Sequence, residues 1–366
     1  MRILIFSHEY PPCLGGAGTI ADLLHKSLSS EYSCNVDILT SRRTKSSFER
    51  RIFTPILSRK LWFFSYLPWL IKNEKKYDFF ILNDPAAIYS AGKILSDATL
   101  EKSICIVHGM EKHLTSSNHL LDLMNFSSCF KRALNNSKNT VFVSDFIKDK
   151  YKNIYNISPK NTTVIHSGAK EIFFNKPIKS KDKDKDKDKD KDKDKDKDKI
   201  NFLTVSRIVK EKGYDRMLSI FENLHTIGIN FSWTIVGDGN YKNEFEEKIL
   251  DSPISDKIQF MGKQPQDVLS NIYPEHDIYI LLSELAESFG LSYLEASASG
   301  LVPIGYNATG VKEAFQYIQN GFLIERSASD YELAREIYNI AKINLTSSCL
   351  RHETDFSQEI IKIIKS

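Results

Sequence analysis

Two glutamates, Glu287 and Glu295, flank a short Ser-Phe-Gly-Leu stretch in the second half of the chain. The run IYILLSELAESFGLSYLEASASG predicts a strand, a loop and a helix whose first turn contains Phe289, Gly290 and Leu291. The unpaired N–H groups of a helix N-terminus favour a phosphate, and a glycine lets a ligand approach the backbone. We expect Glu287 to bind sugar hydroxyls and Glu295 to accept two neighbouring hydroxyls, as a ribose presents them. The alternative is two surface glutamates near a helix start.

A second group of residues suits a diphosphate. In TVSRIVKEKGYDRML a strand ends at Arg207, and Lys212 stands where the next helix opens. Two cations at this spacing can bind both phosphates of a diphosphate. The simpler interpretation of this pair is a solvated loop.

Two further features follow strands in the first half of the chain. Gly15 and Gly16 begin the run GGAG between the first strand and the predicted helix TIADLLHKSL, where backbone amides can face a phosphate. This run lacks the spacing of the dinucleotide fingerprint GxGxxG, which disfavours a nicotinamide cofactor. His108 ends the strand of CIVHG, where a structural histidine is the alternative to a functional one.

The elements that position these residues recur twice along the chain. RILIFS, NVDILTS, DFFILN, SICIVHG, TVFVS and TTVIHS are short apolar or β-rich runs, and NFLTVSR, SWTIVGDG, IQFMG, IYILLS, LVPIGY and GFLIE follow later. Most alternate with segments of helical length such as YKNEFEEKIL, a pattern typical of parallel sheets covered by helices. We therefore predict two doubly wound α/β domains, whose ligands bind beyond the carboxyl ends of the strands.

A low-complexity segment divides the two halves. Residues 181–199 alternate strictly between ten lysines and nine aspartates, and such a run can bury nothing. We interpret it as a solvated linker, and the DKD triplets in it as an accident of composition rather than a metal site. The expected domains are 1–178 with a C-terminal helix at 355–366, a linker at 179–199 and a second domain at 200–354.

Composition restricts the class of protein. The 366 residues are 41% hydrophobic and 27% charged with a net charge of +3, which gives no reason to expect nucleic acid as a partner. Five cysteines show no metal-binding spacing, which indicates a reducing compartment. No run approaches the length of a membrane span, and MRILIFSHEYPP is too short for a signal peptide. We expect a cytoplasmic protein.

The segment 42–76 raises the question of a membrane surface. It carries ten basic and two acidic residues and includes the aromatic run RKLWFFSYLPWLIKNEKK. This composition suits a peripheral contact with anionic lipid. The alternative is a core-facing helix of the first domain that is broken at Pro68 and has its lysines in solvent.

Taken in order, these motifs resemble the retaining GT-B glycosyltransferases of family 4 along nearly the whole chain. HEYPPCLGGAG is similar to the glycine loop of the family, VSRIVKEKG to its Arg–Lys diphosphate clamp, VGDGNYKNEFE to its next strand-loop-helix and ESFGLSYLEASASGLVPIGYNATGVKEA to its E-x7-E block with the following loop. DFSQEIIKIIK resembles the last helix, which in this fold crosses back to the first domain. The resemblance implies a GT-B fold, with two Rossmann-like domains facing a central cleft.

The resemblance also implies roles for the residues above. A nucleoside diphosphate sugar would bind mainly to the second domain. The donor-binding set would be Arg207 and Lys212, the amides of Phe289, Gly290 and Leu291, the backbone of Gly15 and Gly16, and Glu295 on the ribose. The catalytic set would be Glu287 on the donor sugar and His108 beside the anomeric carbon. Fixed cations and a helix dipole would stabilise the leaving diphosphate, so that neither a metal nor another cofactor is expected.

The implied function is transfer of a sugar, with retention of configuration, to a glycan or lipid-linked acceptor in bacterial lipopolysaccharide or capsule biosynthesis, at the inner face of the cytoplasmic membrane. The alternatives are a GT-B sugar-nucleotide epimerase and an inactive GT-B binding module. The sequence departs from the family at Ser167-Gly168-Ala169-Lys170, where Asn-Gly-Val-Asp is usual, and at Thr309-Gly310, where Gly-Gly is usual. These departures put the preference for sugar and acceptor in doubt.

Overall fold

The computed structural model describes residues 1–11, 16–30, 34–41, 51–54, 62–109, 124–174 and 199–366. The chain forms two compact units, one of residues 1–167 and 353–366 and the other of residues 168–352. This division falls earlier than the boundary predicted at residue 178. Ala169 bridges to His352 and Phe173 packs against Tyr273, so this stretch belongs to the second unit.

The described part of the first unit contains a seven-stranded sheet in the order β3-β2-β1-β4-β5-β6-β7, with parallel pairing throughout. Its strands are β1 Arg2–Phe6, β2 Asn35–Ser41, β3 Arg51–Thr54, β4 Phe79–Leu82, β5 Ser103–Val107, β6 Asn139–Phe142 and β7 Thr162–Val164. Its helices are α1 Gly16–Ser30, α2 Leu67–Asn73, α3 Pro85–Ile94, α4 Asp97–Leu100, α6 Phe126–Asn136, α7 Asp145–Tyr155 and α15 Glu353–Lys365, with 3-10 turns η1 Trp62–Ser65 and η2 Glu74–Lys76.

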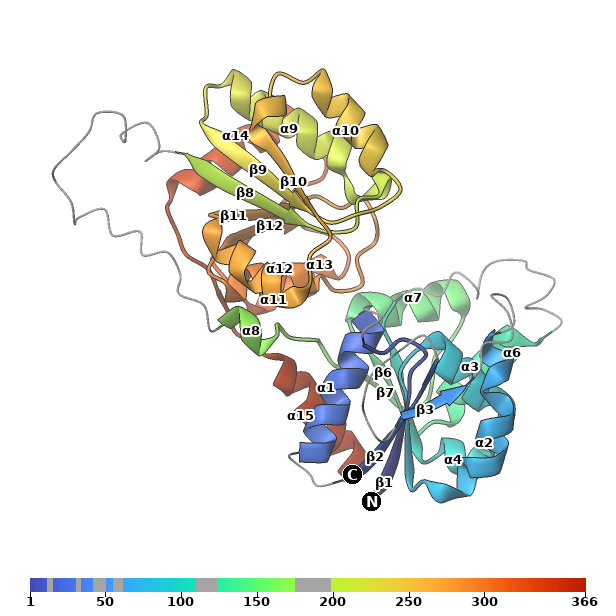
Figure 1. Ribbon diagram of the computed structural model, residues 1–366. Helices are drawn as coiled ribbons and strands as arrows, with labels where there is room; N and C mark the ends of the chain where they lie inside the picture. Colours follow the sequence, from blue (N-terminus) through green and yellow to red (C-terminus); the bar gives the residue numbers. More distant parts are fainter. Residues whose placement is uncertain (12–15, 31–33, 42–50, 55–61, 110–123, 175–198) are drawn as a thin grey trace. The chain divides into compact units, whose positions relative to one another are not determined.

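Helices cover both faces of this sheet, because residues of β1 alternate between two cores. Leu4 and Phe6 lie in the core beneath α3 and α6, while Ile3 and Ile5 lie in the core formed with α1 and α15. The C-terminal helix α15 lies beside α1 (Figure 1), and Ser27 Oγ donates to Ser357 Oγ at 3.1 Å. The predicted return of the last helix to the first domain is confirmed.

The second unit is built on a six-stranded sheet in the order β10-β9-β8-β11-β12-β14, with β13 and β15 paired separately. The strands are β8 Ile200–Val205, β9 Phe231–Val236, β10 Ile258–Gly262, β11 Ile278–Leu281, β12 Val302–Tyr306, β13 Ile318–Gln319, β14 Phe322–Ile324 and β15 Ser348–Cys349. The helices are α8 Glu171–Phe174, α9 Tyr214–Thr226, α10 Lys242–Leu250, α11 Gln266–Ile272, α12 Leu291–Ala298, α13 Val311–Ala314 and α14 Asp330–Lys342, with 3-10 turns η4 Lys210–Lys212, η5 Ser255–Lys257, η6 Tyr273–Glu275 and η7 Phe315–Tyr317. In this sheet too, every strand pair is parallel.

Apart from β3, the strands of both sheets coincide with the apolar runs of the sequence, and the predicted pair of doubly wound α/β units is confirmed. The KDKD repeat at 181–199 lies outside the described residues except for Lys199. In each unit the carboxyl ends of the parallel strands meet at one edge of the sheet, where the residues of interest follow them.

Candidate functional site

The loop after β8 carries both predicted phosphate-binding cations. Arg207 is exposed, and no hydrogen bond or ion pair joins its guanidinium to a described residue. Lys212 is buried at 8% exposure at the end of η4. Gly213 follows as the N-cap residue of α9 with φ of 76°, and a Cβ at this position would lie 2.0 Å from the carbonyl oxygen of Leu282. Only glycine lets this loop approach the end of β11 so closely.

The loop after β11 leads into α12. Gly290 is the N-cap residue of this helix, with φ of 108°, and Leu291 is its first residue. Phe289 and Gly290 therefore precede the helix rather than lie in its first turn, which corrects the predicted boundary. A Cβ on Gly290 would lie 2.9 Å from Cδ2 of Tyr293, so the conformation and the space both require glycine. The start of this helix is where the sequence predicted a phosphate.

A largely buried ion pair joins these two loops. Lys212 Nζ donates to Glu287 Oε1, and the two side chains are 11% and 18% exposed. The loops are also joined by the backbone, because the amides of Glu284 and Leu285 both donate to the carbonyl of Glu211 at 2.9 Å. The structure therefore brings a cation and a carboxylate together at one edge of the second sheet, with Arg207 in the same loop as Lys212.

Glu295 lies on α12 with a buried tyrosine beside it. The hydroxyl of Tyr273 donates to Glu295 Oε2 at 3.4 Å. Burial, together with the charge of Glu295, raises the pKa of Tyr273 well above its ordinary value, so this phenol remains a neutral donor. This contact orients the carboxylate of Glu295, a residue that is half-buried on α12. Tyr279, whose hydroxyl donates to Ser292 Oγ at 2.7 Å, supports the same helix.

The loop after β12 supports the backbone at Glu287. The amide of Gly310 donates to the carbonyl of Glu287 at 3.1 Å. A Cβ on Gly310 would lie 2.2 Å from the carbonyl oxygen of Ser288, so this second position of the usual Gly-Gly pair requires glycine. Thr309, at the first position, adopts φ of 53°, which is uncommon for a β-branched residue.

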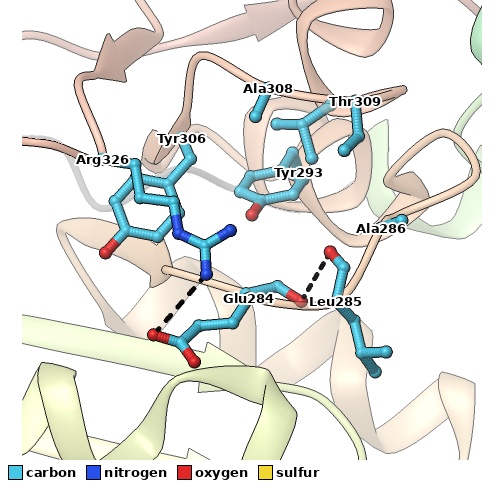
Figure 2. A pocket seen from close by; sticks show the side chains of 10 residues that line it. Glu284, Leu285, Ala286, Tyr293, Tyr306, Ala308, Thr309 and Arg326 are labelled. Atoms are coloured by element: carbon cyan, nitrogen blue, oxygen red, sulfur yellow. Dashed lines mark hydrogen bonds and ion pairs between the residues drawn. The ribbon is translucent and has the colours of Figure 1, made fainter.

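A small pocket lies next to this loop (Figure 2). Its volume is about 170 Å³, and its lining consists of Ser283, Glu284, Leu285, Ala286, Tyr293, Tyr306, Ala308, Thr309, Val311 and Arg326. Arg326 and Glu284 form an ion pair at 3.8 Å, with Thr309 and Ala286 on the opposite side of the view. Typical small-molecule sites enclose about 300 Å³ or more, so we do not assign the donor to this pocket.

In the first unit, His108 follows β5 and is half-buried. Its Nε2 lies 3.1 Å from Oδ1 of Asn83, which follows β4 and is fully buried. Burial lowers the pKa of His108 to about 4, so its imidazole is neutral near pH 7. Asn83 Nδ2 also donates to the carbonyl of Ala17 at 2.7 Å and to Ser7 Oγ at 3.0 Å.

The residue after Asn83 is a buried carboxylate. Asp84 accepts hydrogen bonds from the amides of His8, Glu9 and Ala87, and from Ser7 Oγ. It caps α3 through the amide of Ala87 at 2.9 Å. Burial raises the pKa of Asp84, while these donors act in the opposite direction.

The glycine run in the first unit is described only in part. Gly15 lies outside the described residues. Gly16 is the first residue of α1 and is exposed, so the helix begins earlier than the predicted TIADLLHKSL. The small residues after Gly16 therefore form the first turn of the helix rather than a loop before it.

The described end of the basic segment 42–76 packs on the first unit. Leu70 and Tyr66 are buried in its core, with Phe64 and Trp69 beside them, while Ile71 is 64% exposed. Pro68 lies in the first turn of α2, so it begins this helix and does not break it, which corrects that part of the alternative interpretation. Residues 42–50 and 55–61 lie outside the described residues.

Sequence reasoning missed Tyr273, Asn83 and Asp84 as parts of these edges. Asn83 and Asp84 directly follow the apolar run of β4, so the rule that polar residues after parallel strands meet at one edge offered a signal for them. Tyr273 offered none, because its contact with Glu295 is made across 22 positions of the chain.

Two family models match the two halves of the chain. Residues 185–354 match the family described as glycosyl transferases group 1, and residues 14–170 match glycosyltransferase family 4. Two parallel-sheet units of this kind, with both families matched in order, define the class: the chain belongs to the group 1, family 4 glycosyltransferases.

Two curated relatives illustrate the likeness. The GtfA subunit of the UDP-N-acetylglucosamine–peptide N-acetylglucosaminyltransferase of Streptococcus agalactiae is 28% identical over 161 residues, which are 43% of this chain and 31% of the relative. The amylovoran biosynthesis glycosyltransferase AmsK of Erwinia amylovora is 26% identical over 129 residues, which are 34% of this chain and 32% of the relative. The chain thus matches about a third of the length of these relatives.

Solved structures resemble the whole chain. Anabaena Alr3699/HepE in complex with UDP and glucose has a TM-score of 0.74 and 16% identity, with 100% of both chains covered. A glycosyltransferase from Rickettsia africae has a TM-score of 0.69 and 20% identity, with 100% of this chain and 97% of that chain covered. At these identities the likeness shows the fold, and the predicted GT-B fold is confirmed. Within the described ranges, no helix is both long and apolar enough to cross a bilayer.

Proposed function

We propose that the protein transfers a sugar from a nucleoside diphosphate sugar to an acceptor, and that the second unit binds the donor. The observation that carries this proposal is the Lys212–Glu287 pair, which joins the β8 and β11 loops beside the start of α12. Arg207 in the same loop has a guanidinium without a partner among the described residues. A diphosphate would supply the negative charge that this arrangement of cations and amide groups favours.

The chemistry follows from where charge develops. As the bond between the anomeric carbon and the diphosphate breaks, negative charge grows on the leaving group, and preorganised cations stabilise it best. Arg207 and Lys212 would bind this group, Glu287 the sugar hydroxyls, and Glu295 the ribose. We infer that the reaction needs no metal because protein cations take that role. We further infer that the acceptor hydroxyl attacks the face the diphosphate leaves, which retains configuration.

We infer that the acceptor is a glycan or a lipid-linked glycan of the bacterial cell surface. The name of the related AmsK assigns that protein to the biosynthesis of amylovoran, which supports a role in polysaccharide assembly. The polar edge of the first unit, with His108 and Asn83 after adjacent strands, offers neutral groups that suit hydroxyls rather than charged acceptors.

A thermal-shift screen with UDP-, GDP-, ADP- and TDP-sugars, with and without EDTA, tests donor binding. Ligand at 100 times its Kd should add about 2.7 kcal/mol of stability. Stabilisation by one nucleotide class, unchanged by EDTA and lost in an Arg207→Ala, Lys212→Met variant, would support the proposal. Lys342→Ala, an exposed cation near the end of α14, is the matched control and should retain binding.

Assays of donor binding, sugar release and transfer with the same protein distinguish the rival functions. No stabilisation across the panel would favour an inactive binding module. Release of free sugar without any acceptor would favour an epimerase. Transfer to an acceptor would contradict the retaining mechanism if NMR of the product showed that the anomeric centre had been inverted.

We also propose a peripheral contact of segment 42–76 with anionic membrane at the inner face of the cytoplasmic membrane. The net positive charge of the segment and exposed Ile71 support it. Co-sedimentation with vesicles that contain phosphatidylserine should be strong at low salt and weak at high salt. Absence of binding at low salt would refute the contact.

A further inference from the structure

We propose that Asn83 is a positioning residue that holds His108 as the tautomer with hydrogen on Nε2, leaving Nδ1 to accept a hydrogen bond from a substrate hydroxyl. The inference rests on the proposed function only for the identity of that hydroxyl. The hydrogen-bond network itself lies wholly within the first unit.

The orientation of the Asn83 amide is fixed by a carbonyl group. The carbonyl oxygen of Ala17 can only accept a hydrogen bond, and it lies 2.7 Å from one end of the amide. That end must therefore be the NH₂ group, which also lies 3.0 Å from Ser7 Oγ. The other end, Oδ1, faces His108. Since Asn83 is fully buried, solvent does not compete for these contacts.

The tautomer of His108 follows from the same rule. Amide oxygen Oδ1 only accepts, so the imidazole nitrogen 3.1 Å away must carry the hydrogen. A neutral imidazole has one N–H, and therefore Nδ1 has a free lone pair. Burial lowers the pKa of His108 to about 4, which keeps the ring neutral near pH 7. No hydrogen bond from another described residue reaches Nδ1.

The charged groups at this edge are engaged elsewhere. Asp84, on the β4 side, accepts from backbone amides and Ser7. Glu9 lies on the β1 side, where burial and the charge of Asp84 raise its pKa and His8 acts in the opposite direction. His8 Nδ1 lies 2.7 Å from the hydroxyl of Tyr66. None of these groups is hydrogen-bonded to His108. Among the residues that the structure describes, the neutral amide of Asn83 is the group that sets the proton position on the ring.

The consequence is a fixed direction for the hydrogen bond to the substrate. A lone pair at Nδ1 accepts the hydrogen of a hydroxyl, whereas the opposite tautomer would present an N–H and could only donate to it. The same amide joins the end of β1 at Ser7 and the first turn of α1 at Ala17. Asn83 thus fixes the His108 ring relative to the end of β1 and the start of α1.

The first experiment is ¹⁵N NMR of the full chain labelled at histidine, with His108→Gln to assign the ring signals. The wild type should show His108 as the Nε2–H tautomer at pH 7. Asn83→Ala should convert it to a mixture or to the Nδ1–H form. A wild-type Nδ1–H ring, or an unchanged tautomer in Asn83→Ala, would overturn the proposal. This measurement needs no activity, so it stands even if the proposed transfer reaction is not found.

A second experiment uses the pH dependence of transfer with Asn83→Asp. A carboxylate beside Nε2–H favours the imidazolium and raises the pKa of His108. Below that raised pKa, Nδ1 carries a proton and cannot accept. Activity of the variant should therefore fall about tenfold per pH unit through a range where the wild type stays level. A variant profile equal to that of the wild type would refute the positioning role.

Asn73→Asp is the matched control. Asn73 is also buried in the first unit, and its side-chain amide donates to the carbonyl of Trp69 at 2.8 Å. Its replacement carries the same cost of a buried carboxylate without a contact to His108. It should leave both the tautomer and the pH profile of transfer unchanged. A shift of the acid limb in Asn73→Asp equal to that in Asn83→Asp would assign the effect to general loss of stability and contradict the proposal.

Discussion

Replacing Glu287 by leucine should destabilise the second unit by about 3 kcal/mol, because it leaves the ammonium of Lys212 buried without its partner. The side chains of the pair are only 11% and 18% exposed, so water compensates little for the lost carboxylate. For a unit of this size, about 3 kcal/mol corresponds to a decrease in Tm of roughly 6 to 12 °C. Differential scanning calorimetry of the full chain would measure it, with one transition expected per unit if the units unfold separately.

A double-mutant cycle separates the pair from its surroundings. Lys212→Met leaves Glu287 unpaired and should cost a similar amount, whereas the double variant Lys212→Met, Glu287→Leu removes both buried charges. Its loss of stability should therefore be smaller than the sum of the two single losses by about 2 kcal/mol. Losses that simply add would refute the coupling.

The matched control lies three residues before Glu287 in the same loop. Glu284 pairs with Arg326 at 3.8 Å, but these side chains are 44% and 53% exposed. Glu284→Ala should change stability by no more than about 0.5 kcal/mol. If Glu287→Leu lowered Tm no more than Glu284→Ala, burial would not determine the strength of the pair and the reasoning would fail.

Three further predictions concern backbone geometry, capping and pH. Gly290→Ala should cost about 2 kcal/mol or more in a urea titration, because φ is 108° and the new Cβ would approach Tyr293 to 2.9 Å, whereas Gly228→Ala, with φ of 83° and open space, should cost only about 1 kcal/mol. Ser329→Ala removes the capping box of α14 and should lower stability by about 1 kcal/mol, and a change in Tm below that of an exposed Ser→Ala control would contradict it. The pKa of His108 is about 4 in the folded chain against an ordinary 6.5, so the unfolded chain binds the extra proton between these values. Stability should fall by up to about 3 kcal/mol as pH decreases through this window, and His108→Gln should flatten that part of the stability–pH curve.

The sheets could be read from the sequence because parallel strands buried on both faces appear as continuous apolar runs. RILIFS and DFFILN predicted β1 and β4, but the polar residues Asn83 and Asp84, which directly follow β4, were not predicted as part of the functional edge. β3 (Arg51–Thr54) was missed, because its four residues lie in a basic segment without such a run. The start of α1 was placed too late, because glycines suggest a loop although their helical cost is only about 1 kcal/mol each.

The partners of the site residues could not be predicted in the same way. Lys212 and Glu287 are 75 positions apart, and their contact depends on the close approach of Gly213 to β11. The sequence placed both residues at strand ends and gave each a ligand, but nothing in their spacing indicated that they pair with each other. Asn83 was similarly visible at a strand end, while its three hydrogen-bonding partners come from other elements.

The path of the chain through the second unit has a consequence for engineering. The chain enters this unit at Gly168 and leaves it at His352, and the amide of Ala169 donates to the carbonyl of Arg351 at 3.0 Å. The rings of Phe174 and His352 stack with centroids 3.7 Å apart. The second unit is therefore an uninterrupted insert with adjacent ends, which favours its excision as an independent module or its exchange for that of a relative. The first unit, by contrast, must be reassembled from two separate pieces, because α15 completes its core.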